Sequence, residues 1–147
     1  MKNDKIKIKV LSRKNAIKYS YRVKEPCAII SVSDMYQEAP KFNRNPNIKE
    51  IIYFFFEDDE ESCRTDPRTI IQHSDAEKIV NFVKRNQNVN EIIVHCVAGI
   101  SRSSGIAAAI MEYFEQDENE IFMNDKYFPN MTCYTRVKEA FEKDNKN

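Results

Sequence analysis

The segment 95–103 has the sequence His-Cys-Val-Ala-Gly-Ile-Ser-Arg-Ser and places a cysteine and an arginine on one short loop. In such a loop successive backbone N–H groups converge on an anion, and a helix that begins at the arginine adds a partial positive charge. The Arg102 guanidinium matches two phosphate oxygens, and the positive surroundings favour the Cys96 thiolate over the neutral thiol. The segment therefore predicts a cradle for phosphate esters with a sulfur nucleophile at its centre.

Both glycines of the chain, Gly99 and Gly105, lie within ten residues of Cys96. We expect Gly99 to supply a turn with positive φ inside the cradle, and Gly105 to let the following helix approach the sheet closely. The alternative is that Cys96 is a buried structural cysteine in an ordinary strand–loop–helix unit. The joint occurrence of the spacing, the glycine and the arginine favours the nucleophile.

Hydrophobic periodicity predicts the elements that would hold this loop. Strands are expected at residues 5–11, 26–33, 49–56 and 91–95, and loops at 37–47, 57–73 and 96–102. Helices are expected from Ser74, with a capping box to Glu77, and at 103–115, 119–122 and 130–143. The alternation indicates an α/β fold with a central, mostly parallel sheet of about four to five strands flanked by helices. Ligands bind beyond the carboxyl ends of such strands, where the strand that ends at His95 leads into the loop.

The length of 147 residues, with 41% hydrophobic and 31% charged residues, predicts that residues 1–147 form one globular domain. A net charge of zero removes the bulk-charge argument for nucleic-acid binding. The charge is uneven, however, because residues 1–50 carry 12 basic and 5 acidic side chains, and residues 51–147 carry 11 basic and 18 acidic ones. No apolar run is long enough to span a bilayer, and residues 1–9 lack the apolar core of a secretory signal. We expect neither a nucleic-acid nor a membrane partner.

The four cysteines, Cys27, Cys63, Cys96 and Cys133, stand far apart and form no C-x-x-C or Cys/His cluster. This spacing argues against a zinc site and, without a secretory signal, indicates free thiols in a reducing compartment, the cytoplasm. We expect no metal and no cofactor. A low-pKa cysteine is readily oxidised, so Cys27 or Cys63 is a candidate resolving thiol; the alternatives are a core residue at 27 and a surface residue at 63.

The segment 95–103 matches the His-Cys-x5-Arg-Ser signature of cysteine-dependent protein phosphatases, and with its internal Ala-Gly-x-Ser it most resembles the small dual-specificity branch. Residues 56–58, Phe-Glu-Asp, resemble the general-acid loop of that family, and residues 128–130, Phe-Pro-Asn, resemble the start of its last helix. The resemblance covers residues 25–141 approximately. It implies the fold of these enzymes and hydrolysis of phosphate monoesters on proteins, at tyrosine and/or serine/threonine, through a phosphocysteine intermediate.

The same resemblance implies the roles of the loop residues. Cys96 would be the nucleophile, and Arg102 would clamp the phosphate. Ser103 would hydrogen-bond the sulfur and help it leave, and His95 would stiffen the loop by bonding backbone carbonyls. The phosphate-binding residues would be Val97, Ala98, Gly99, Ile100, Ser101 and Arg102.

The resemblance also implies an aspartic acid that protonates the leaving oxygen, and its register selects Asp58. A side chain at the tip of a strand can be aimed better than one deep in a loop, which favours Asp58 and Asp59 over Asp66. Asp58 precedes Cys96 by 38 residues, a longer separation than is usual in the family. Asp59 is therefore the alternative general acid.

The substrate is constrained by what the chain lacks. It is too short for the large tyrosine-specific catalytic domain, and the pocket-deepening Asn-Arg-Tyr segment of that domain is missing. A shallow cup that admits phosphotyrosine and phosphoserine/threonine is expected. No lysine lies between Cys96 and Arg102, which disfavours an inositol head group. The alternatives are a catalytically silent phosphate-binding module, and a phosphatase acting on RNA 5′-ends, phosphoinositides or other small phosphate esters.

Overall fold

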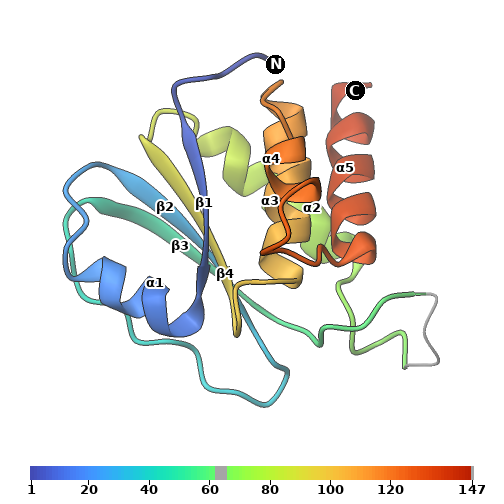
Figure 1. The fold of residues 1–147 in the computed structure, drawn as a ribbon, viewed down its shortest axis with the longest axis horizontal. Helices are drawn as coiled ribbons and strands as arrows, with labels where there is room; N and C mark the ends of the chain where they lie inside the picture. The colour runs from blue at the N-terminus through green and yellow to red at the C-terminus, as the bar shows by residue number, and fades with distance from the viewer. Residues whose placement is uncertain (62–65, 147) are drawn as a thin grey trace.

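A four-stranded parallel sheet forms the centre of the computed structural model, which describes residues 1–61 and 66–146 (Figure 1). The strands are β1 (Lys7–Ser12), β2 (Cys27–Ser33), β3 (Ile48–Phe55) and β4 (Glu91–Cys96), in the order β1-β4-β2-β3. The helices are α1 (Arg13–Ser20), α2 (His73–Arg85), α3 (Arg102–Tyr113), α4 (Asn119–Phe122) and α5 (Met131–Asn145). Because every strand runs the same way, their carboxyl ends meet at one edge of the sheet.

The central strands are buried along their whole length, whereas the outer strands are not. Every residue of β2 and β4 is buried, as expected for inner strands of a parallel sheet covered on both faces. The edge strands β1 and β3 keep exposed lysines, Lys7 and Lys49. Charged side chains on edge strands protect a sheet from pairing with other chains.

Helices cover the two faces unequally. On one face α2, α3 and α5 pack over the main core, which includes Ile30, Val94 and Ile106 (Figure 1). The other face carries α1 and a smaller apolar cluster around Ile29 and Ile93. Among the residues that the structure describes, no helix has both the length and the apolar sequence needed to cross a membrane.

The predicted α/β class and its strands are confirmed. Each strand lies within two residues of its predicted range, and the sheet has four strands, all parallel. The short helix at 119–122 has its predicted bounds, and the predicted stripe of α2, with Ala76, Ile79, Val80 and Val83, is buried. Alternation and helical periodicity report burial directly, which is why these predictions succeed.

Two local features differ from the predictions. Helix α1 was not predicted, because it has few apolar residues; it begins after Ser12, whose Oγ accepts the Asn15 N–H at 3.1 Å. Helix α2 is capped by Gln72 and not by Ser74, and the Gln72 backbone N–H donates to the Asp75 carboxylate at 2.8 Å. The two residues before this cap, Ile70 and Ile71, are each 1% exposed, so the chain enters the helix directly after a buried anchor.

Both glycines allow close contacts between backbone segments, but the contact at Gly105 is not the predicted one. Gly99 has φ +71°, as predicted, and a Cβ there would lie 2.6 Å from the backbone of Leu11. The prediction that Gly105 lets α3 approach the sheet is wrong. A Cβ at Gly105 would lie 2.5 Å from the backbone oxygen of Asn130, so the close approach joins α3 to the start of α5.

We expect Gly105→Ala to destabilise the fold by about 1–3 kcal/mol, because backbone at Asn130 must move to admit the methyl group. In an uncrowded helix interior the same substitution stabilises by roughly 0.5–1 kcal/mol, so the sign of the change is diagnostic. Urea unfolding followed by circular dichroism measures it. A stabilised variant would show that α3 and α5 do not meet closely at this point.

Candidate active site

The segment 95–103 forms a tight turn between the end of β4 and the start of α3. Cys96 is the last residue of β4 and is 2% exposed, and Arg102 is the first residue of α3. The turn is fastened to its surroundings, since the Arg13 N–H donates to the Val97 carbonyl at 3.1 Å and the Gly105 N–H donates to the Ser101 carbonyl at 3.1 Å. The sequence-predicted cradle residues 97–102 therefore lie on one anchored loop at the carboxyl edge of the sheet.

Ser103 lies beside the Cys96 sulfur. The Ser103 Oγ is 3.0 Å from the Cys96 Sγ, which is hydrogen-bonding distance for this pair, and Ser103 is fully buried. A hydroxyl in this position can donate to a thiolate and stabilise it. The geometry agrees with the role that the resemblance implies for Ser103.

Arg102 is a buried cation held on one side only. Its Nη1 donates to the Asp34 Oδ1 at 2.8 Å and to the Phe56 carbonyl at 2.7 Å. Its Nε is buried and has no hydrogen-bond partner among the described residues. An unpartnered N–H of a buried guanidinium is costly, so this edge of the side chain is suited to an incoming anion.

Asp34 is a site residue that the sequence analysis missed. It directly follows β2, so it stands at the same carboxyl edge as the loop after β4, and its side chain is 48% exposed while that of Arg102 is 6% exposed. The signal was an acidic residue at a strand's carboxyl end. Periodicity alone does not tell which strands are neighbours, and the pairing of β2 with β4 brings Asp34 to Arg102.

His95 is buried and neutral. Its Nε2 lies 2.6 Å from the Ser31 Oγ, and its Nδ1 lies 3.2 Å from the Cys96 carbonyl oxygen. Burial lowers the pKa of His95 to about 4, with only partial compensation from the bond to the Cys96 carbonyl. Both ring nitrogens are engaged, which fits a side chain that stiffens the loop and does not act as a general base near neutral pH.

Asp58 reaches the loop from the end of β3. Its Oδ1 accepts hydrogen bonds from the Ser101 Oγ at 2.8 Å and from the Asn130 Nδ2 at 3.0 Å. The first of these bonds places the carboxylate against a residue of the cradle. At the neighbouring candidate, Asp59, the backbone carbonyl accepts a hydrogen bond from the Asn130 Nδ2 at 3.1 Å.

Asp66 is engaged elsewhere. Its carboxylate accepts three hydrogen bonds from the Arg68 side chain, including one of 2.8 Å from the Arg68 Nη2. These hydrogen bonds lower the pKa of Asp66 to about 2. Arg68 therefore holds this carboxylate, which makes Asp66 a weaker candidate for the general acid than a carboxylate bound to the cradle.

Asn130 joins residues 57–61, which we call the acid loop, to the cradle. The sequence analysis did not predict this role. Its Nδ2 binds Asp58 and the Asp59 carbonyl, its Oδ1 accepts the Cys133 N–H at 2.9 Å, and its backbone N–H donates to the Ser101 carbonyl at 2.9 Å. The residue is 2% exposed. The signal available in the sequence was a Pro-Asn pair before the last helix, which indicates a cap but not these further partners.

The acid loop is also fastened to the first turn of α5 (Met131–Asn145). The Met131 N–H donates to the Glu60 Oε1 at 2.6 Å, and the Glu61 N–H donates to the Thr132 Oγ1 at 2.8 Å. The first of these bonds satisfies a backbone donor that a helix start leaves free. The run of carboxylates that the sequence shows after β3 is therefore partly used to cap a helix.

The remaining cysteines differ in their surroundings. Cys27 is fully buried, as the core alternative predicted, and burial raises its pKa to about 11. Cys133 lies in the first turn of α5 and is 1% exposed, and burial raises its pKa well above the usual value. Cys27, Cys96 and Cys133 are free thiols, and Cys63, the other candidate resolving thiol, lies outside the described residues.

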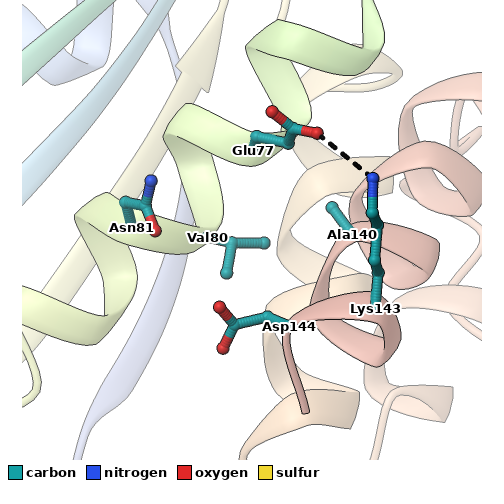
Figure 2. A pocket seen from close by; sticks show the side chains of 6 residues that line it. All are labelled: Glu77, Val80, Asn81, Ala140, Lys143 and Asp144. Carbon is teal, nitrogen blue, oxygen red and sulfur yellow. Dashed lines mark ion pairs between the residues drawn. The ribbon is translucent and has the colours of Figure 1, made fainter. Parts of the chain in front are cut away.

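A separate hollow lies between α2 and α5, away from this site. It encloses about 170 Å³ and is lined by side chains such as Val80, Asn81 and Ala140 (Figure 2). Glu77 and Lys143 face each other across it at 3.9 Å. Its lining contains no residue of the segment 95–103.

No protein-family model matches the sequence, and no curated protein matches it. Solved structures do resemble it. Human DUSP28 superposes with a TM-score of 0.59 at 13% identity, covering 95% of this chain and 94% of that one. PTPMT1 in complex with PI(5)P gives 0.56 at 13% identity, with 95% and 93% covered. OH1 from the Orf virus, described as a tyrosine phosphatase with triple substrate specificity, gives 0.53 at 17% identity, with 90% and 79% covered.

These likenesses extend over nearly the whole chain and concern the arrangement of its strands and helices. Together with the parallel sheet and the loop between β4 and α3, they identify the architecture: the chain has the fold of the small dual-specificity and related cysteine-dependent phosphatases.

Proposed function

We propose that this protein is a cysteine-dependent phosphatase that hydrolyses phosphate monoesters on proteins, at tyrosine and/or serine/threonine. The observation that carries the proposal is the buried Arg102 Nε, which has no partner among the described residues and belongs to the loop that starts at Cys96. A phosphate oxygen would satisfy this donor. It would also bring the phosphorus to the sulfur, as a displacement reaction requires.

The proposed reaction has two steps. The Cys96 thiolate attacks phosphorus, the S–P bond forms as the P–O bond to the leaving group breaks, and Asp58 gives its proton to the leaving oxygen. A water then attacks phosphorus, Asp58 takes its proton, and the S–P bond breaks. The loop amides and Arg102 hold the non-reacting oxygens throughout, and Ser103 donates to the sulfur as it leaves.

The rim of the cradle supports a phosphorylated side chain as substrate. Val97 is 38% exposed, Ile100 is 41% exposed, and Phe128, whose N–H donates to the Ile100 carbonyl at 3.0 Å, is 78% exposed. These apolar side chains can pack against the ring or methylene groups that carry the phosphate. A rim of this kind suits an amino-acid side chain better than a multiply charged sugar.

A phosphoinositide is the second candidate substrate, because PTPMT1, a structural neighbour, was solved with PI(5)P. Against it stands the lack of any cation between Cys96 and Arg102, which leaves the additional phosphates of such a head group without partners. Comparing phosphopeptides with phosphoinositides at equal concentration separates the two candidates. We further propose that residues 1–147 act as one catalytic domain in the cytoplasm, with no metal or cofactor.

Cys96→Ser should abolish turnover of an aryl phosphate while the variant still binds inorganic phosphate, because the cradle persists without its nucleophile. Phosphate release and isothermal titration measure the two properties. Cys27→Ser is the matched control, since it exchanges the same atoms in a buried residue outside the loop and should keep turnover. An active Cys96→Ser enzyme would refute the mechanism.

Arg102→Lys should lower kcat/KM by about 10²–10³-fold, the usual effect of removing one donor to the developing charge. A lysine can bind Asp34 and the Phe56 carbonyl, or it can bind phosphate, but it cannot do both as the guanidinium does. Steady-state kinetics with an aryl phosphate gives the ratio. A loss smaller than about tenfold would mean that phosphate does not sit on this side chain.

Asp58→Asn should lower turnover of phenyl phosphate by about 10²-fold or more, because the leaving phenolate then receives no proton. The loss should be much smaller for dinitrophenyl phosphate, whose leaving group needs none. Asp59→Asn is the control and should have little effect on either substrate. The opposite pattern would assign the acid to Asp59, and equal losses with both substrates would exclude Asp58 as the acid.

A further inference from the structure

A second charged hollow lies at the opposite edge of the sheet, where β1 and β4 begin. It encloses about 450 Å³, and Tyr19 of α1 is among the residues that line it. The cations that line it are Lys5, Lys7, Lys9, Arg22 and Lys24, and its carboxylates are Glu25 and Glu91. We call it the basic hollow. It collects much of the positive charge that the sequence concentrates in residues 1–50.

The carboxylate at the floor of the basic hollow is already neutralised. Glu91 is 7% exposed; the Tyr19 hydroxyl donates to its Oε1 at 2.5 Å, and the Lys9 Nζ lies 3.2 Å from its Oε2. Within residues 1–61 and 66–146, no ion pair engages the other four cations of the hollow. Only Glu25 remains to balance them, so the hollow carries a net positive charge.

Two of the cations meet at the ring of Tyr19. The Lys9 Nζ lies 4.3 Å from the centre of the Tyr19 ring, and the Arg22 guanidinium carbon lies 5.4 Å from it. The strand side is fixed as well, because the Lys7 N–H donates to the Asn90 carbonyl at 2.9 Å. A concave site with convergent cations on fixed backbone focuses its potential on an anionic group.

The basic hollow is separate from the cradle but within reach of the same ligand. Glu91 and Cys96 are the two ends of β4, and five steps along a strand correspond to about 17 Å. One phosphate cannot contact both sites. Because β4 is buried, a peptide must take a longer path over the surface than this straight line. An extended segment of more than about six residues can therefore place a phosphorylated side chain in the cradle and acidic side chains in the hollow.

The chemistry of the hollow favours an acidic peptide over other polyanions. Glu25 and Glu91 would repel a continuous phosphodiester backbone, and the chain has no net positive charge to draw nucleic acid. Tyr19 is the one aromatic or aliphatic side chain in the lining, so the hollow has nothing to insert into a bilayer. Carboxylate side chains can instead pair one by one with the free lysines.

We propose that the basic hollow binds an acidic segment of the phosphoprotein substrate, several residues away from the phosphorylated side chain. The inference rests on the proposed phosphatase function for its role in substrate choice. It names the substrate class more closely: phosphoproteins that carry a cluster of Asp or Glu at a distance from the phosphorylation site.

The test compares Lys7→Glu/Lys24→Glu with the control Lys78→Glu/Lys146→Glu, which makes the same charge change at exposed lysines outside the hollow. The substrates are phosphopeptides that share one phosphotyrosine core. The test peptides carry a tract of about five glutamates at a distance from the phosphotyrosine, on either side of it, and the control peptides carry glutamines in the same positions. For the unmodified protein and the control, the glutamate tract should raise kcat/KM by about tenfold at low salt. Lys7→Glu/Lys24→Glu should lose this advantage and keep full turnover of p-nitrophenyl phosphate.

Binding of the unphosphorylated glutamate peptide, followed by fluorescence anisotropy, tests the hollow without catalysis. If no variant turns over p-nitrophenyl phosphate but this binding depends on Lys7 and Lys24, the phosphatase function fails and the binding site stands. An equal glutamate advantage in both double variants would overturn the proposal. The proposal would also be overturned if the glutamate tract did not raise kcat/KM of the unmodified protein. A third contrary result would be that Lys7 and Lys24 are needed to bind phosphatidylserine vesicles or RNA but not to bind the peptide.

Discussion

The geometry of the candidate site depends on one buried amide, the side chain of Asn130. Its Nδ2 holds the acid loop through Asp58 and the Asp59 carbonyl, and its Oδ1 caps α5. Its backbone N–H holds the cradle at Ser101. An amide supplies both donors and an acceptor, which neither a carboxylate nor a hydroxyl can do in the same place. The position of Asn130 also explains why residue 105 is a glycine, because a side chain there would collide with the Asn130 backbone.

What the sequence could predict was local. The cradle and Ser103 lie on one continuous segment after Cys96, and buried strands show their periodicity directly. The contacts that complete the site were out of reach, because Arg102 meets Asp34 across 68 positions and Asn130 meets Asp58 across 72. Such pairs depend on the strand order β1-β4-β2-β3, and periodicity does not contain strand order.

Helix boundaries show the same limit on a smaller scale. Ser74 and Glu77 satisfy the capping pattern as well as any pair in this stretch, yet Gln72 and Asp75 form the cap. Local propensity permits both starts, and burial of the preceding isoleucines selects one. Helix α1 escaped prediction for the related reason that it packs against a small cluster and needs few apolar residues.

The Arg102–Asp34 pair links the fold to the chemistry proposed for it. A buried guanidinium needs compensation, and Asp34 with the Phe56 carbonyl supplies it entirely through Nη1. The cation is therefore oriented before any ligand arrives, while Nε remains unpartnered. Because Arg102 is oriented in advance, an incoming phosphate needs to induce less reorganisation. Before a phosphate binds, the half-exposed Asp34 balances the charge of the guanidinium. Attraction to Arg102 and repulsion from Asp34 both scale with the charge of the ligand, so the pair by itself does not choose among anions. The unpartnered Nε is the part of Arg102 that still offers a hydrogen bond to one.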